Sequence, residues 1–162
     1  MRRKKRNKTV KISSAMLNQK FHPCTFSFVE NVCRGRCCEG SEGIMVTIHR
    51  TELKKFRAKG AKIQDGFFAA AENGLCPFKS ENGLCSIHED KPKGCAFSPF
   101  TLNKNGTLVV RNTYRLLKCY KVAEGKLPAY DAHAWSLKKI FGEKEYLRIR
   151  KHLSSGGGDM MA

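Results

Sequence analysis

Apolar residues recur with near-helical spacing in two parts of this chain. In the longer part, from Asp131 to about Leu153, Lys and Arg fill the positions between Trp135, Leu137, Ile140, Phe141, Tyr146, Leu147 and Ile149. This pattern predicts one or two amphipathic helices, broken at Gly142, whose apolar stripe packs on the core. In residues 49–60, Leu53 and Phe56 stand three apart among strong helix formers. The second pattern predicts a short helix that stops at its final glycine.

A β-hairpin is expected between these two parts. The β-prone runs Pro99–Leu102 and Thr107–Arg111 flank the sequence Asn103-Lys104-Asn105-Gly106. An Asn-Gly turn between two such runs is a strong local signal for an antiparallel pair of strands.

A five-residue segment occurs twice. Glu72-Asn73-Gly74-Leu75-Cys76 returns nine residues later as Glu81-Asn82-Gly83-Leu84-Cys85. In each copy, Asn-Gly predicts a tight turn with positive φ, after which Leu anchors the segment and Cys presents its thiol from a fixed bend. Metal-binding knuckles are generally built in this way, so the two thiols are expected to be equivalent ligands.

Length and composition indicate one small domain. The chain has 162 residues, of which 41% are hydrophobic, with 10 Phe and 14 Gly. We therefore expect a modest core that needs something besides burial to hold it together. The expected fold is α+β, a loop-rich, metal-organised domain over residues 21–153. A flexible basic arm (residues 1–20) and a flexible Ser/Gly-rich tail (residues 154–162) are expected on either side.

The charge of the chain is strongly positive and uneven. There are 31 Lys and Arg residues against 14 Asp and Glu, which gives a formal net charge of +17. Seven cations lie in the first eleven residues: Arg2, Arg3, Lys4, Lys5, Arg6, Lys8 and Lys11. Such an arm is either a solvated tail or a binder of polyanions such as RNA. Since the arm has no aromatic residue, we expect contacts to phosphates and no reading of bases.

The N-terminal segment and the apolar runs bear on the compartment. No apolar run reaches the roughly 18 residues of a membrane span, and residues 7–14 supply no apolar segment of a secretory signal. We expect a cytoplasmic chain with reduced thiols. The Arg-rich, acid-poor start also resembles an organelle transit peptide, so import into an organelle is the alternative.

The eight cysteines are the candidate chemistry of the chain. They are Cys24, Cys33, Cys37, Cys38, Cys76, Cys85, Cys95 and Cys119. With Gly35 between them, Cys33 and Cys37 are able to converge on one ion. In an extended stretch Cys37 and Cys38 would point to opposite sides, which suggests two neighbouring sites or a cluster. Further ligands are then needed from later in the chain.

Cys76, Cys85 and Cys95 can supply those ligands, because each lies beside a turn-forming Gly or Pro. His88 is a candidate mixed ligand or a polar turn residue, and His22 is a weaker candidate. Cys119 is either a further ligand or a buried structural thiol.

These residues resemble a known family. The segments Cys33–Gly43, Leu75–Phe78, Leu84–Pro92 and Cys95–Phe100 are similar to the YkgJ-type cysteine-cluster proteins, which are described as zinc- or iron-chelating. The resemblance covers about residues 24–120. It implies that Cys33, Cys37, Cys38, Cys76, Cys85 and Cys95 are metal ligands. The sequence departs from the family pattern in two places. The family usually has two closely spaced cysteines before the vicinal pair, whereas only Cys33 closely precedes it here, and His88 stands where a Tyr is usual.

The expected cofactor is zinc, with iron or an iron–sulfur cluster as the alternative, since both accept tetrahedral sulfur ligation. No phosphate-binding loop, metalloprotease helix or nucleophile elbow is present. Three functions remain open. The first is a metal-stabilised module with a basic surface for nucleic acid or a ribonucleoprotein. The second is an iron–sulfur or metal-handling redox protein, and the third a subunit of a protein-modifying enzyme.

Overall fold

The computed structural model describes residues 9–38 and 47–162 as short helices packed around small sheets. The α-helices are α1 (Ser14–Leu17), α2 (Phe26–Phe28), α3 (Leu53–Ala58), α4 (Lys93–Phe97), α5 (Lys118–Lys121), α6 (Ala129–Ala132), α7 (Ala134–Phe141) and α8 (Glu143–Ser154). The described residues also contain a π-helical turn, η1 (Val29–Cys33), and four separate 3-10 turns: η2 (Arg36–Cys38), η3 (Arg50–Glu52), η4 (His88–Asp90) and η5 (Asn112–Leu116). The expected α+β class is confirmed.

Within the described ranges, the strands form one four-stranded sheet and two short pairs. They are β1 (Lys11–Ile12), β2 (Lys20–Phe21), β3 (Ile63–Gln64), β4 (Phe67–Phe68), β5 (Phe100–Leu102), β6 (Thr107–Val110), β7 (Leu127–Pro128) and β8 (Met160–Met161). The larger sheet has the order β5-β6-β1-β8, in which β1 is parallel to β6 and antiparallel to β8. Strands β2 and β7 form one pair, and β3 and β4 form the other.

The expected hairpin and helices are confirmed. In the β5–β6 turn, the Asn103 side-chain oxygen accepts hydrogen bonds from the amides of Asn105 and Thr107 at 2.9 and 3.0 Å. The short helix expected within residues 49–60 forms as η3 followed by α3. The C-terminal pattern forms α7 and α8, which separate at Gly142 with φ +83°. The apolar stripe of these two helices packs on the core through Leu137, Tyr146, Ile149 and Leu153.

The predicted arm and tail boundaries are wrong within the described residues. Ile12 is completely buried in β1, and the chain ends in β8, which pairs with the other side of β1. Val10 and Ala162 exchange backbone hydrogen bonds of 2.7 and 2.9 Å. A two-residue strand carries no periodicity, so its long-range partners alone create it. Arg2, Arg3, Lys4, Lys5, Arg6 and Lys8 lie outside the described residues, whereas Lys11 pairs with Asp159 at 3.1 Å.

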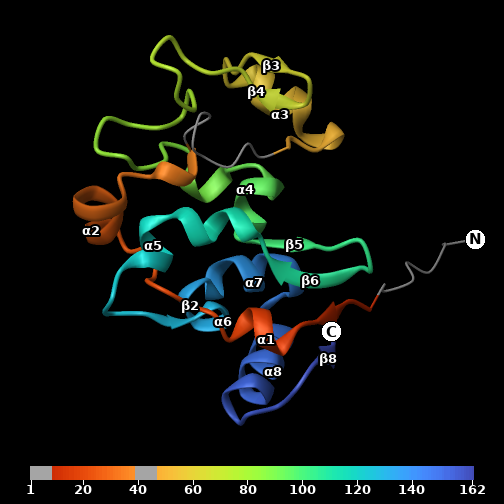
Figure 1. Cartoon of the computed structure of the whole chain (residues 1–162). Coiled ribbons are helices and arrows are strands. Elements are labelled where there is room, and N and C mark those ends of the chain that lie inside the picture. The colour runs from red at the N-terminus through yellow and green to blue at the C-terminus, as the bar shows by residue number, and fades with distance from the viewer. Residues whose placement is uncertain (1–8, 39–46) are drawn as a thin grey trace, which may run out of the picture.

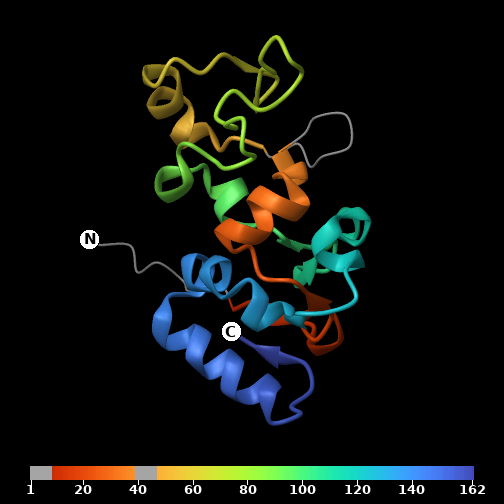
Figure 2. The same cartoon turned by 90° about the vertical axis from the view of Figure 1, so that its left-hand side faces the viewer.

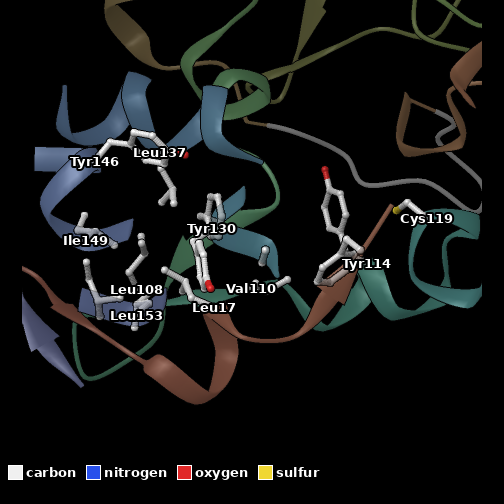
Figure 3. Packing of buried hydrophobic residues seen from close by; sticks show 14 of the residues in the cluster. Leu17, Leu108, Val110, Tyr114, Cys119, Tyr130, Leu137, Tyr146, Ile149 and Leu153 are labelled. Atoms are coloured by element: carbon white, nitrogen blue, oxygen red, sulfur yellow. The ribbon is translucent and has the colours of Figure 1, made fainter. Parts of the chain in front are cut away.

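The described residues form two hydrophobic clusters, and α3, which contributes to one, and α8, which contributes to the other, lie at different levels in Figure 2. We name residues 47–90 the small lobe and residues 9–38 with 91–162 the main body. The core of the main body contains sixteen buried residues and reaches from Ile149 on α8 to Tyr114 and Cys119 (Figure 3). The small lobe buries only Ile48, Phe56 and Ala61 in its own cluster. In both cartoons α3 and α8 lie at opposite ends (Figure 1).

None of the helices in residues 9–38 and 47–162 combines the length and apolar character that crossing a membrane requires.

Candidate metal centre

Seven of the eight cysteines line one cavity. Its volume is about 230 Å³. The seven are Cys24, Cys33, Cys37, Cys38, Cys76, Cys85 and Cys95, and we call this space the thiol cavity. Apolar side chains from both parts of the chain complete the wall, among them Phe26 and Val29 from the main body and Phe68, Phe78 and Ile87 from the small lobe. The cavity therefore lies where the two parts meet.

The first cysteine motif is a compact double turn. Cys33 ends η1, and Arg34 and Gly35 both adopt positive φ, at +54° and +63°. This reversal leads directly into η2, which contains Cys37 and Cys38. Their sulfur atoms lie 4.0 Å apart. Our expectation that this vicinal pair points to opposite sides is wrong, because the segment is a 3-10 turn and not extended.

Both copies of the repeat form the expected turns. Gly74 and Gly83 have φ of +76° and +86°. In the first copy the Asn73 side-chain oxygen accepts a hydrogen bond from the amide of Leu75 at 3.0 Å. Asn82 does the same for Leu84 at 3.3 Å. Each turn thus delivers the thiol that follows it to the cavity wall.

The remaining candidates lie in different surroundings. Cys95 comes from α4, and Cys24 lies two residues before the start of α2. Cys119 is buried in the main core and is not among the residues that line the cavity. His88 does line it, with its ring centroid 5.5 Å from that of Trp135. The His22 ring instead stacks on Phe28 at 3.9 Å.

The surroundings of the thiols oppose negative charge when no cation is bound. Cys24 is exposed at the surface, but the protein packed around its thiol, followed by repulsion from Cys119 and Cys33, raises its pKa to about 12. Burial and repulsion from Cys38 and Cys76 raise the pKa of Cys95 to about 12. The hydrogen bond with Cys37, together with burial, raises the pKa of Cys38 even further above its ordinary value. Since a thiolate is the ligand form, a bound cation must replace these protons.

Positive charges from Lys91 and Lys79 face this group of thiols. The Lys91 ammonium lies 4.4 Å from the centroid of the Trp135 ring, and Lys91 also lines the cavity. Its charge partly offsets the burial that raises the pKa of Cys24, Cys38 and Cys95. Sequence reasoning missed Lys91, although it precedes Pro92 within the cysteine-rich segment. It also missed Phe26, Val29 and Tyr114 in the wall.

The donor set fits a thiophilic metal. Two sulfurs on one tetrahedral zinc with Zn–S bonds of about 2.3 Å are about 3.8 Å apart, which is close to the Cys37–Cys38 spacing. However, no three Cys, His, Asp or Glu side chains of the described ranges are already gathered closely enough to hold an ion. Binding thus requires the wall to close around the metal. Thiolates of this kind suit zinc and iron–sulfur clusters.

A family model described as "CxxCxxCC: Putative zinc- or iron-chelating domain" matches residues 29–114. The matched segment begins in η1 and ends at Tyr114, and so contains six of the seven cavity cysteines. No curated protein and no solved structure matches the chain.

Proposed function

Because the chain belongs to the CxxCxxCC family of zinc- or iron-chelating cysteine-cluster domains, we propose that its metal joins the small lobe to the main body. The finished module then presents a basic surface to nucleic acid or a ribonucleoprotein. In this proposal the metal serves the fold and zinc is the occupant.

One observation carries the structural role of the metal: the donors come from both sides of the junction. Cys33 and Cys37 pack against the core of the main body. Cys76 and Cys85 follow the two turns of the small lobe, beside Phe78 and Ile87 of its separate cluster. With only three buried residues, that cluster is too small to hold the lobe in place by burial alone.

We assign the central ligands by their position around Cys38. The amide of Cys76 donates a hydrogen bond to the carbonyl oxygen of Cys38 at 3.3 Å, and Cys38, Cys76, Cys85 and Cys95 all line the cavity. Repulsion from Cys38 also contributes to the raised pKa values of the other three thiols. These four thiols are therefore the proposed primary set, with Cys37 at 4.0 Å from Cys38 as the nearest alternative. Cys24 and Cys33 complete the wall. When bound, zinc supplies charge that neutralises the thiolates, and the protein supplies the geometry.

The basic arm supports the nucleic-acid part of the proposal. The described chain begins beside β1 and β8, at the α8 end of the molecule, and the thiol cavity adjoins α4 and the small lobe (Figure 1). An arm attached there can contact a polyanion without contributing to the metal site. Its cations are also close together in sequence, which suits a phosphate backbone.

Deletion of residues 1–8 tests this part and leaves β1 in place. We expect weaker binding to RNA of any sequence. The slope of the logarithm of the binding constant against the logarithm of the salt concentration should become shallower. The expected change is about 0.7 to 0.9 for each phosphate that the arm neutralises in the full chain. Metal content should be unchanged. A control that replaces Lys54 and Arg57 on α3 by Gln shows whether any removal of charge has the same effect. Equal binding with and without residues 1–8 at two salt concentrations rejects the role of the arm.

A second candidate function is favoured by the size of the cavity. Structural zinc sites are closed, whereas seven thiols around a space of about 230 Å³ with apolar walls also suit an iron–sulfur cluster. The protein would then be a metal-handling or redox protein. Optical absorption of protein purified without oxygen separates the two. A colourless sample that contains zinc supports the first function, and a brown sample with charge-transfer bands supports the second.

A further inference from the structure

We infer that Gly35 and Gly83 are positioning residues of the metal centre, and that the two copies of the repeat are therefore not equivalent. The inference rests on the proposed metal-binding function. It assigns to Gly83 a role that Gly74, its counterpart in the first copy, does not have.

Gly35 and Gly83 lie where two backbone segments cross in close contact. A Cβ atom on Gly83 would lie 2.6 Å from the carbonyl carbon and 2.8 Å from the carbonyl oxygen of Arg34. In the opposite direction, a Cβ atom on Gly35 would collide with the carbonyl oxygen of Gly83. The obstacles are backbone atoms, which cannot rotate away as a flexible side chain would. Neither glycine can carry a side chain unless the segments separate.

The crossing joins the segments that contain the first cysteine motif and the second repeat. Gly35 lies between Cys33 and Cys37, and Gly83 lies two residues before Cys85. The Arg34 guanidinium spans the same crossing and donates a hydrogen bond to the carbonyl oxygen of Glu81 at 2.7 Å. The contact thus fixes the position of the turn before Cys85 relative to the turn that contains Cys33 and Cys38. A shift of about 1 Å matters here, because Zn–S distances vary by only a few tenths of an ångström.

The first repeat has the same local geometry without the crossing. Gly74 also has positive φ, yet a Cβ atom there would meet nothing within 4 Å. Cys76 instead donates a backbone hydrogen bond to the carbonyl oxygen of Cys38 at 3.3 Å, a contact that does not require a missing side chain. The chain therefore contains a matched pair of glycines. Both carry the cost of positive φ, and only one is in close backbone contact.

The test compares Gly83→Ala with Gly74→Ala in the full chain. Zinc affinity is measured by competition with a chelator, and zinc content by elemental analysis. Both substitutions introduce similar backbone strain, so the difference between them reports the crossing. We expect Gly83→Ala to lower the zinc affinity about 10- to 100-fold, as for other residues that orient metal ligands. Gly74→Ala should lower it less than about threefold. Asn accepts positive φ, so the pair Gly83→Asn and Gly74→Asn repeats the comparison with less strain.

A double variant shows whether Gly35 and Gly83 act together. If both act through one crossing, Gly35→Ala with Gly83→Ala should weaken zinc binding no more than the worse single variant. Full additivity, or equal affinities of the Gly83 and Gly74 variants, overturns the inference. If the Gly83 variants do not fold, Arg34→Ala is the milder probe. It removes the hydrogen bond across the crossing to Glu81, together with the bond from the Arg34 guanidinium to the carbonyl oxygen of Glu30 at 2.9 Å, and we expect zinc affinity to fall severalfold. Unchanged affinity in that variant also overturns the inference.

The outcomes separate this inference from the proposed function. If neither the wild-type chain nor the Cys85→Ser variant retains zinc or iron, the metal-binding function is rejected. A wild-type chain that binds zinc and loses it on Cys85→Ser, but not selectively on Gly83→Ala, rejects only the positioning role.

Discussion

The carboxylate of Glu52 accepts a hydrogen bond from the backbone amide of Lys93 at 3.1 Å, and this contact connects the small lobe to the first turn of α4. Glu52 is only 9% exposed, so the bond is protected from water. A carboxylate at a helix start satisfies an amide that has no partner within the helix. Since α4 contains Cys95, the same bond orients one of the cavity thiols.

We predict that Glu52→Ala lowers the free energy of unfolding by about 1 to 3 kcal/mol, because it leaves a partly buried amide without its partner. Thermal unfolding measures this, with Glu89→Ala as an exposed control in the neighbouring η4. The control should shift the melting temperature by no more than a degree or two. Equal effects of the two variants would show that the Glu52 contact is not a structural link.

Removal of the metal should affect the two parts of the chain differently. The main body has sixteen buried core residues and should remain folded, whereas the small lobe has three and depends on the junction. Hydrogen exchange after chelation measures this. We expect faster exchange over residues 47–90, with protection retained in β6 and α8. Unchanged exchange in the small lobe would contradict a structural metal.

Cysteine substitutions should divide into two groups. Cys76→Ser and Cys85→Ser should each remove about as much metal as Cys38→Ser, since all three thiols line the cavity and belong to the proposed primary set. Cys119→Ala is the matched control, because that thiol lies in the main core and not in the cavity wall. Elemental analysis of purified protein gives the metal content. Full metal occupancy in the Cys76 and Cys85 variants would show that the repeat forms two turns but supplies no metal ligand.

Stability should depend on the protonation of His133 in the main body. Burial lowers the pKa of His133 from 6.5 to about 4, and its Nε2 atom has no hydrogen-bond partner within the described chain. Between these two values the unfolded chain binds the proton and the folded chain does not, so stability falls as the pH drops from about 6.5 toward 4. The decrease amounts to roughly 3 kcal/mol at the lower limit.

Replacement of His133 by Phe isolates this effect from acid-induced metal release, which both proteins share. Its ring already contacts Phe21 and Phe100, with centroids 5.4 and 6.2 Å away, so an apolar ring suits the site. The difference in melting temperature between the two proteins should grow in favour of His133→Phe as the pH falls. A difference that does not vary with pH would contradict a neutral buried histidine.

Several elements followed from sequence because neighbouring residues determine them. Leu53 and Phe56 indicated α3, and the Asn-Gly sequence before Thr107 indicated the β5–β6 hairpin. Gly142 separated α7 from α8 as expected. In each case, side-chain periodicity or the freedom of glycine to adopt positive φ acts over a few residues, and distant parts of the chain do not alter it.

The set of candidate thiols was also available from sequence, but their arrangement was not. Cys33, Cys76 and Cys85 could be selected from spacing and turn residues alone. The orientation of Cys37 relative to Cys38 depends on η2, and the extended geometry assumed from sequence would have separated their sulfurs. The burial of Cys119 in the main core is likewise a result of packing.

The tertiary structure alone decided which equal-looking segments differ. The repeat makes Gly74 and Gly83 identical in sequence, yet only Gly83 is in close contact with Arg34. Lys11–Ile12 becomes a strand only because it pairs with β6 and with Met160–Met161, and Met160–Met161 becomes one only because it pairs with Lys11–Ile12. Sequence by itself determined the local turns, the helices and the supply of thiols, since these depend on short-range sterics and side-chain chemistry. Contacts between residues far apart in the chain, which no local pattern encodes, decided the rest.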